Sequence, residues 1–226
     1  MNPIIIALDV ENAGEARRIV ESLGDSVSFY KVGLELYASA GMDFVRDLKQ
    51  QGHRVFLDLK LYDIGETVKR AVVQLAKSGA DFLTIHAMRQ VMQAAVAGRA
   101  DSGLKLLGVT VLTSVDQRDL QEDGYTCSLS DLVETRVRNI VADGVDGIVC
   151  SPVGVARVRA LAPQAVIVTP GVRSAGASAG DQKRVATPAE AVANGADYLV
   201  IGRQVTRSKD PRGEVLRILD EISARV

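Results

Sequence analysis

Short apolar runs alternate with longer amphipathic segments along the whole chain, and this alternation restricts the fold more than any other feature. We expect strands at eight runs rich in β-branched residues and leucine: Ile4–Leu8, Phe29–Val32, Val55–Leu59, Phe82–His86, Leu106–Leu112, Gly147–Val149, Val166–Thr169 and Tyr198–Ile201. Strands that alternate with helices predict a parallel sheet covered by those helices. Because no linker rich in Pro, Gly or Ser interrupts the pattern, we expect a single domain over residues 1–226, folded as a (β/α)₈ TIM barrel.

The segments between these runs have the periodicity of amphipathic helices. We expect helices at Ala13–Leu23, Asp43–Gln51, Glu66–Ser78, Val91–Ala100, Leu129–Ala142, Gly154–Leu161, Pro188–Asn194 and Glu214–Ala224. Before three of the strands the chain carries a similar phrase with a central glycine, at residues 78–81, 143–146 and 194–197. Glycine at this point suits the left-handed residue that ends many helices. Neither a G-x-G-x-x-G turn after a strand nor a P-loop is found, which argues against dinucleotide and nucleoside-triphosphate binding.

Composition excludes several classes of protein. The 226 residues include 27 basic and 28 acidic ones, without a basic tract, so we do not expect a nucleic-acid-binding protein. The first residues have neither the basic region of a signal peptide nor the length of a membrane span, so we expect a cytoplasmic protein that does not bind membranes. The two cysteines, Cys127 and Cys150, are too few for a disulfide framework, and no spacing indicates a metal site.

The third expected strand carries opposite charges where a core residue would be apolar. Asp58 and Lys60 are two residues apart, so their side chains project from the same face of the strand, and Asp63 follows in the next turn. An isolated buried charge costs several kcal/mol unless it is paired. This strand therefore either buries an ion pair or lines a functional pocket, and perturbed charges favour the pocket.

A TIM barrel predicts where such a pocket lies, because active sites sit at the C-terminal ends of the strands. The polar residues at or after the ends of the first five strands would gather at this rim: Asp9, Lys31, Asp58, Lys60, His86, Thr113 and Ser114. Taken alone, Asp9 could cap a helix and His86 could be a core histidine, so it is their joint placement that indicates a site. His53 precedes its strand and is expected at the opposite, surface-exposed end.

The loops after the last two strands have a different chemistry. Residues 169–173 read Thr-Pro-Gly-Val-Arg and residues 201–204 read Ile-Gly-Arg-Gln, so each loop combines a glycine with an arginine. TIM barrels frequently bind phosphate with these two loops, and the planar donors of Arg203 suit such a contact. A turn glycine beside a surface arginine explains either loop alone. The segment 174–182, rich in small residues, could close over a ligand through Gln182 or be a plain connection.

Together these motifs resemble the orotidine 5′-monophosphate decarboxylase family. The resemblance covers nearly the whole chain and includes Ala7-Leu8-Asp9, Lys31, the pattern Asp58-x-Lys60-x-x-Asp63, Pro170-Gly-Val-Arg173, Gly180-Asp-Gln182 and Gly202-Arg203. It implies loss of CO₂ from orotidine 5′-monophosphate to give UMP, the last step of pyrimidine nucleotide synthesis, without a cofactor or metal. It also implies a homodimer in which Asp63 and Thr67 reach the partner's site.

The same resemblance implies a role for each residue. Lys60 would stabilise the carbanion and protonate it, with Asp58 beside the leaving carboxylate and with Asp63 and Lys31 completing the catalytic group. The residues implied in substrate binding are Asp9, Lys31, Thr67, Thr113, Ser114, Arg173, Gln182, Gly202 and Arg203. A lysine held between acids stays protonated, which suits a reaction that leaves a carbanion.

Two alternatives remain. Sugar-phosphate decarboxylases and synthases with a related barrel share the Asp-x-Lys-x-x-Asp pattern but use Mg²⁺, so a metal requirement would distinguish them. The second alternative is a non-catalytic protein that binds a nucleoside monophosphate, although such a protein has no need for alternating charges inside a barrel. The segment 117–127 has no interpretation from its sequence.

Overall fold

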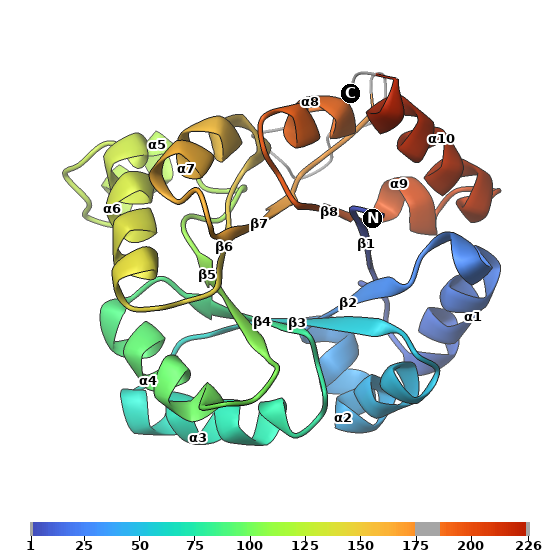
Figure 1. Ribbon diagram of the computed structural model, residues 1–226, viewed down its shortest axis with the longest axis horizontal. Helices are drawn as coiled ribbons and strands as arrows, with labels where there is room; N and C mark the ends of the chain where they lie inside the picture. The colour runs from blue at the N-terminus through green and yellow to red at the C-terminus, as the bar shows by residue number, and fades with distance from the viewer. Residues whose placement is uncertain (1, 175–185, 225–226) are drawn as a thin grey trace.

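Eight parallel strands close into a barrel in chain order within residues 2–174 and 186–224, the part that the computed structural model describes (Figure 1). The predicted (β/α)₈ barrel is therefore confirmed. The strands are β1 (Ile4–Ala7), β2 (Phe29–Gly33), β3 (Arg54–Leu61), β4 (Phe82–His86), β5 (Lys105–Val109), β6 (Gly147–Val149), β7 (Val166–Pro170) and β8 (Tyr198–Ile201).

Helices form an outer ring around these strands (Figure 1). They are α1 (Ala13–Leu23), α2 (Leu34–Gln50), α3 (Gly65–Ala76), α4 (Arg89–Arg99), α5 (Gln117–Glu122), α6 (Leu129–Ala142), α7 (Val155–Leu161), α8 (Pro188–Ala193), α9 (Arg203–Thr206) and α10 (Pro211–Ser223), with 3₁₀ turns at Gly24–Ser26 and Pro152–Gly154. Among the described residues, no helix combines the length and the apolar character needed to cross a membrane.

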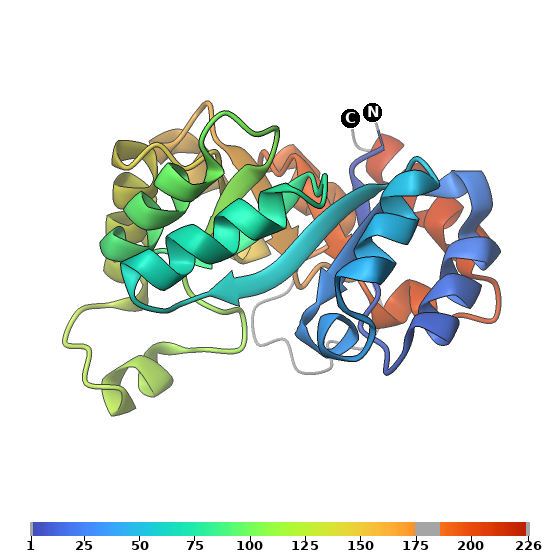
Figure 2. The same cartoon turned by 90° about the horizontal axis from the view of Figure 1, so that it is seen from below.

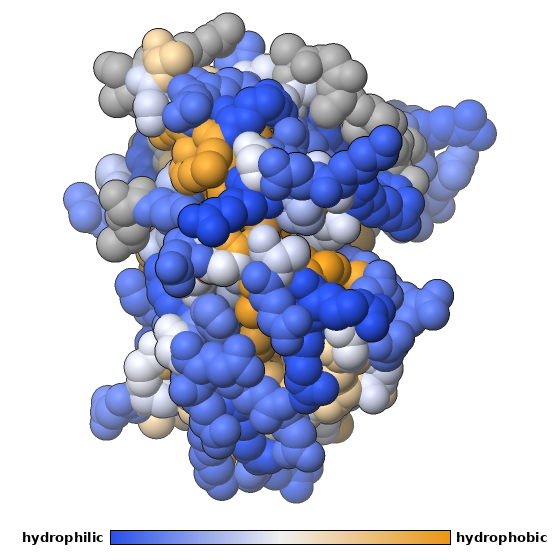
Figure 3. All heavy atoms as spheres, turned by 90° about the vertical axis from the view of Figure 1, so that its right-hand side faces the viewer, coloured by the Kyte–Doolittle hydropathy of each residue, from blue (hydrophilic) through white to orange (hydrophobic). Residues whose placement is uncertain are grey.

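The first helix illustrates how local sequence sets these elements. The side chain of Asn12 accepts a hydrogen bond from the backbone N–H of Glu15 (3.0 Å) and so caps the start of α1. The residues that α1 buries recur at helical spacing, from Ala16 through Ile19 to Leu23. Its other face is solvent-exposed, and the surface over α1 and α10 is mostly hydrophilic with isolated apolar side chains (Figure 3).

The core has two layers. The larger cluster fills the space between strands and helices and includes Ile4, Ile6 and Leu8 of the first strand region. A smaller cluster takes the alternate residues Ile5 and Ala7, together with side chains from other strands, and fills the barrel interior. This alternation sends every second residue of a strand inward, which places charged residues of β2 and β3 inside the barrel.

The N-terminal end of the barrel is closed by side chains. Arg54, the first residue of β3, places its guanidinium carbon 4.0, 5.5 and 5.3 Å from the ring centres of Phe29, Phe82 and Tyr198. These aromatic residues are the first residues of β2, β4 and β8, and their rings meet edge to face. Arg54 also donates a hydrogen bond to the Tyr198 hydroxyl (3.0 Å). The cation and the rings together form a structural plug.

Two expectations about the elements are wrong, and one segment without an expectation forms a helix. Strand β5 ends at Val109 rather than Leu112, because the backbone N–H and the hydroxyl of Thr110 both bond to the Val149 carbonyl and the chain then leaves the sheet. Helix α2 begins at Leu34 rather than Asp43, since it consists of two helical segments joined at Gly41, where φ is 64°. The uninterpreted segment 117–127 contains α5.

Candidate active site

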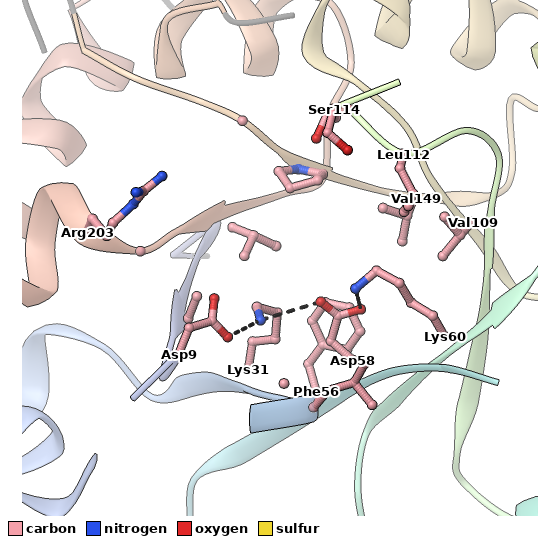
Figure 4. A pocket seen from close by; sticks show the side chains of 18 of the residues that line it. Asp9, Lys31, Phe56, Asp58, Lys60, Val109, Leu112, Ser114, Val149 and Arg203 are labelled. Carbon is pink, nitrogen blue, oxygen red and sulfur yellow. Dashed lines mark hydrogen bonds and ion pairs between the residues drawn. The ribbon is translucent and has the colours of Figure 1, made fainter. Parts of the chain in front are cut away.

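A cavity of about 590 Å³ opens at the C-terminal end of the barrel. In the side view, β3 points toward this end of the barrel, and α5 lies beyond it (Figure 2). The cavity is lined by ends of strands and by the loops that follow them, including Asp9, Lys31, Asp58, Lys60 and Arg203. The close-up shows these charged side chains facing a common space (Figure 4). The rim that the barrel topology predicts as the functional end is therefore hollow and charged.

Four charged side chains form a chain of alternating sign on one side of this cavity. The ammonium of Lys31 donates a hydrogen bond to Asp9 Oδ1 (2.7 Å) and lies 3.4 Å from Asp58 Oδ2. The ammonium of Lys60 donates to the other carboxylate oxygen of Asp58 (2.8 Å). The side chains of Lys31 and Asp58 are only 8% and 14% exposed, whereas that of Lys60 is 30% exposed. Lys60 is therefore the cation of this group that is open to a ligand.

Mutual pairing keeps the buried members of this group charged. Burial alone would raise the pKa of Asp58, but the charges of Lys31 and Lys60 hold it below its ordinary value. Hydrogen bonds from Lys60 and Thr84 lower the same pKa further. Burial would lower the pKa of Lys31, but Asp58 and Asp9 raise it above its ordinary value. At neutral pH the site therefore holds an ionised carboxylate between ammonium groups.

The backbone at Lys60 has an unusual conformation. Its φ is 48°, in the left-handed region, which costs a residue with a side chain about 1–2 kcal/mol. The pairing of β3 with β4 shifts its register between Leu57 and Leu61, around this residue. The fully buried Thr84 of β4 accepts a hydrogen bond from the Lys60 backbone N–H (2.9 Å) and donates one to Asp58 Oδ1 (3.0 Å). Strained backbone of this kind is concentrated at functional sites.

The sequence analysis missed Thr84, because a single threonine within an apolar strand gives little sign of its role. It also missed Gly33 at the end of β2. A Cβ atom at Gly33 would lie 2.6 Å from Asp9 Oδ1 and 3.0 Å from Lys31 Nζ. A side chain at this position would therefore displace the ion pair of Asp9 and Lys31 from its observed geometry, so glycine suits it. The position of Gly33 directly after the strand that carries Lys31 could have indicated this.

The loops after β7 and β8 line the opposite side of the cavity. Arg203 lies across the cavity from Lys60 (Figure 4). The same side is lined by Gly171, Arg173 and Gly202. The backbone of Gly171 has a φ of 81°. Arg207, which the sequence analysis did not select, also lines the cavity. This side offers guanidinium groups beside glycine backbone, an arrangement suited to an anion.

A hydrogen-bonded cluster holds these two loops together. The amide of Gln204 donates to the Ser174 hydroxyl (3.0 Å) and to Glu214 of α10 (2.8 Å). The backbone N–H of Ser174 donates in return to Gln204 Oε1 (3.3 Å). Ser174 is buried, so the start of the segment after β7 is fixed to the loop that carries Arg203.

The remaining expected residues fall into three groups. Thr113 and Ser114 line the cavity. Asp63 and Thr67 are not among its lining residues in this chain, and Asp63 is exposed, with its carboxylate accepting a hydrogen bond from the Ile64 backbone N–H (2.7 Å). Gln182 and most of the segment 174–182 lie outside the described residues.

The two histidines lie at opposite ends of the barrel, as expected, but neither lines the cavity. His53 packs edge to face on Tyr30 (5.0 Å between ring centres). His86 ends β4 and packs on Tyr62 (5.4 Å), in the loop that precedes Asp63. Within the described residues, no cluster of three or more His, Cys, Asp or Glu side chains is arranged to hold a metal ion.

Known proteins match this chain along its length. The model of the orotidine 5′-phosphate decarboxylase / HUMPS family matches residues 2–218. Orotidine 5′-phosphate decarboxylase of a Rhodopseudomonas palustris strain is 52% identical over 221 residues, which are 97% of this chain and 94% of the relative. The protein of that name from Caulobacter vibrioides is 52% identical over 225 residues, covering 97% of each chain.

Solved structures agree with these relatives. The crystal structure of orotidine 5′-phosphate decarboxylase from Lactobacillus acidophilus superimposes with a TM-score of 0.86 at 35% identity, covering 98% of this chain and 99% of the other. An uncharacterized conserved protein from Geobacillus kaustophilus superimposes with a TM-score of 0.84 at 37% identity, covering 97% of this chain and 100% of the other.

Proposed function

Because the chain belongs to the orotidine 5′-phosphate decarboxylase / HUMPS family, we propose that it removes CO₂ from orotidine 5′-monophosphate to give UMP, in the synthesis of pyrimidine nucleotides. The observation that carries the proposal is the alternating chain Asp9, Lys31, Asp58 and Lys60, which lies inside a cavity across from Arg203. Such a cavity has a place for a reacting carboxylate and a separate place for a phosphate.

The reaction needs a cation beside the carbon that loses CO₂. The bond from the ring carbon to the carboxylate breaks and its electron pair stays on the ring carbon, which has no adjacent electron sink. In our proposal the Lys60 ammonium stabilises this carbanion and then donates a proton to it, so the products are CO₂ and UMP. Asp58 accepts a hydrogen bond from the Lys60 ammonium and, in our proposal, lies where the substrate carboxylate would be repelled.

The remaining charged and polar residues would bind the rest of the substrate. Asp9 and Lys31 would hold the ribose hydroxyls. The base would lie toward Thr113 and Ser114, with Gln182 contributing from the segment after β7. Arg203, with Arg173 and the backbone of Gly202, would hold the phosphate.

The energy of one charge pair is too small to explain the rate acceleration, so binding of the phosphate must contribute. One charge pair at 4 Å supplies roughly 4 kcal/mol at an effective dielectric constant of 20. Enzymatic accelerations can require up to ~23 kcal/mol. Binding energy from the phosphate must therefore position the ring against Lys60, which makes Arg203 part of the rate acceleration as well as of the affinity.

The experiment is a direct assay. Purified protein, treated with EDTA, is mixed with orotidine 5′-monophosphate, and loss of the orotate absorbance is followed while UMP is identified by chromatography. We expect full conversion without an added cofactor. No conversion at enzyme concentrations near that of the substrate would refute the proposal. Activity that EDTA abolishes and Mg²⁺ restores would point to the metal-dependent sugar-phosphate enzymes instead.

We also propose that the active form is a homodimer in which Asp63 and Thr67 of the partner subunit complete each site. The loop after β3 supports this, because Tyr62 and Ile64, on either side of Asp63, are 67% and 73% exposed next to the cavity rim. Large apolar side chains exposed at such a point favour contact with another protein surface. A two-fold symmetric dimer would then bring each Asp63 to the other copy.

Mixing two inactive variants tests the shared site. Lys60→Ala and Asp63→Ala are each expected to lose activity, because each removes a group from every site. If the site is shared, subunit exchange yields hybrids in which one site carries both changes and the other is intact. About a quarter of the wild-type activity should return at random exchange. Exchange without recovered activity would contradict the shared site.

A further inference from the structure

Thr84 occupies a position at the site that no role in the proposed reaction accounts for. It is fully buried in β4, and its side chain contacts two members of the charged chain on β3. The hydroxyl accepts a hydrogen bond from the backbone N–H of Lys60 at 2.9 Å and donates one to Asp58 Oδ1 at 3.0 Å. The same carboxylate oxygen accepts the hydrogen bond of the Lys60 ammonium at 2.8 Å. Backbone, carboxylate and ammonium are thus joined in one closed ring of contacts.

The direction of these hydrogen bonds is determined. A hydroxyl has one proton, and a backbone N–H can only donate, so the oxygen of Thr84 must accept from Lys60. Its own proton is then free to bond to an acceptor, and the ionised carboxylate of Asp58 is one. The hydroxyl rotor is therefore set by its two neighbours, and the arrangement favours an ionised Asp58, whose pKa is held below its ordinary value.

The contact lies where the backbone is strained. Lys60 has a φ of 48°, and the ladder between β3 and β4 loses its regular register around it. At this point the Lys60 backbone N–H donates its hydrogen bond to a side-chain hydroxyl of β4. A side chain, and not the ladder, fixes the direction in which Lys60 leaves the strand.

We propose that Thr84 is a positioning residue of this site, whose hydroxyl ties the left-handed backbone of Lys60 to the carboxylate of Asp58 and so holds the Lys60 ammonium at the reacting carbon. Its kinetic consequence rests on the proposed decarboxylation, whereas the geometric link does not. Thr84 does not line the cavity, so it acts through Lys60 and Asp58 and not on the substrate.

The test uses variants that separate the hydroxyl from the shape of the side chain. Thr84→Val keeps the shape and removes both hydrogen bonds, and we expect kcat to fall by about 100-fold while KM changes little, because the phosphate side of the cavity is untouched. Thr84→Ser keeps the hydroxyl and should retain most of the turnover. A loss that is merely structural would lower the melting temperature of both variants without this split between kcat and KM.

Thr169→Val is a matched control. Thr169 is a fully buried threonine on β7, and within the described residues its hydroxyl has no hydrogen-bond partner. Thr169→Val removes the same hydroxyl from a buried position of the barrel without breaking a hydrogen bond among the described residues. Because Thr169 begins the segment 169–173, this control concerns kcat alone, and we expect it to lack the selective loss of kcat that Thr84→Val shows.

A second readout does not depend on turnover. The carboxyl ¹³C signal of Asp58 is titrated by NMR in wild type, Thr84→Ser and Thr84→Val. The charged groups that face Asp58, Lys31 and Lys60, as well as Asp9 behind Lys31, are present in all three proteins. Loss of the donated hydrogen bond should therefore move the Asp58 midpoint upward in Thr84→Val alone.

The outcomes separate this inference from the proposed function. A wild-type protein that does not convert orotidine 5′-monophosphate refutes the function and leaves the NMR titration as the test of Thr84. Wild-type kcat in Thr84→Val, or an unchanged Asp58 midpoint, overturns the inference. So does a Thr84→Ser variant as impaired as the valine one. If Thr84→Val does not fold, Thr84→Cys replaces it, and a cysteine variant as active as the serine variant overturns the proposal, because a thiol is only a weak donor and acceptor.

Discussion

Both ends of the barrel place cations inside the ring of strands, but the neighbours of these cations differ. At the N-terminal end the Arg54 guanidinium lies over Phe29 and its neighbouring rings, which fill the barrel, and its Nε lies 3.6 Å from the Asp81 carboxylate. At the C-terminal end the ammonium groups of Lys31 and Lys60 face carboxylates and a cavity of about 590 Å³. Packed aromatic rings stabilise a cation by electrostatic attraction to their faces, and they leave no space for a ligand. Carboxylates keep a cation charged while one side of it stays open.

The same two strands, β2 and β3, contribute side chains to both ends of the barrel. Strand β3 begins with Arg54 and continues to Asp58 and Lys60, and β2 begins with Phe29 and continues to Lys31. The inward-facing positions change from a packed plug to a charged cavity within a few residues. We therefore expect substitutions at the C-terminal end to change turnover, and substitutions at the N-terminal end to change stability.

The largest effect is expected for Lys60→Ala. In the proposed mechanism the ammonium is both the stabilising charge and the proton donor, so kcat should fall by about 10⁴-fold or more. Binding of UMP, measured by calorimetry, should change little because the phosphate contacts remain. Lys105→Ala, an exposed lysine at the opposite end of the barrel, is the control and should have wild-type kinetics. A fall in kcat of less than tenfold would contradict the role of Lys60.

Arg203→Ala tests the other side of the cavity. Loss of a charged contact to the phosphate should raise KM and the UMP dissociation constant by about 100-fold. The value of kcat should fall as well, because part of the phosphate binding energy positions the ring. Arg18→Ala, at an exposed position on α1, is the matched control. If UMP binds Arg203→Ala as tightly as the wild type, the phosphate is not held there.

Arg54→Met tests the structural plug. Replacement of the cation by an apolar side chain removes the cation–π contacts, the hydrogen bond to the Tyr198 hydroxyl and the ion pair with Asp81 (3.6 Å), and the free energy of unfolding in urea should fall by about 1–2 kcal/mol. Turnover per folded molecule should not change, since Arg54 is at the far end of the barrel. Arg17 lies 5.7 Å from the Phe44 ring at an exposed site, and Arg17→Met should change stability by no more than about 0.5 kcal/mol. A selective loss of kcat in Arg54→Met would contradict the expectation that substitutions at the N-terminal end change stability and not turnover.

The smallest effects concern the histidine at each end. Burial lowers the pKa of both His53 and His86 below 6.5, and the charges of Arg136 and Lys60 lower that of His86 further. As pH falls below 6.5 the unfolded chain therefore takes up these protons first, and the free energy of unfolding should decrease. In Lys60→Ala, NMR titration should show a higher pKa for His86 and an unchanged one for His53. A shift of both pKa values would contradict the separation of the two ends. A shift of neither would contradict the effect of the Lys60 charge on His86.

The sequence was sufficient for the fold and for the rim, because both depend on periodicity. Eight apolar runs predict the barrel, and the barrel predicts that Asp9, Lys31, Asp58 and Lys60 meet at one end. The strand ends and α5 were less predictable. Where β5 ends depends on the side-chain bond of Thr110, and α5 depends on a capping box between Asp116 and Asp119 rather than on an apolar face.

Contacts that arise only from the register of neighbouring strands were not predictable. The left-handed backbone at Lys60 contradicts the regular alternation from which its orientation was inferred, although the side chain still reaches Asp58. Thr84 bonds to both because β4 lies beside β3 at that level, which no pattern within either strand indicates. Asp63 and Thr67 point to another limit, since the shared site that we propose for them would leave no spacing signal within one chain.

The most direct test of the account is a crystal structure of the protein with UMP bound. We predict that the phosphate contacts Arg203 and the backbone at Gly202, that the ribose lies against Asp9 and Lys31, and that the carbon protonated in the reaction lies within hydrogen-bonding reach of the Lys60 ammonium. The plug around Arg54 should be unchanged. A phosphate bound at Lys31 and Lys60, or a nucleotide outside this cavity, would contradict the account.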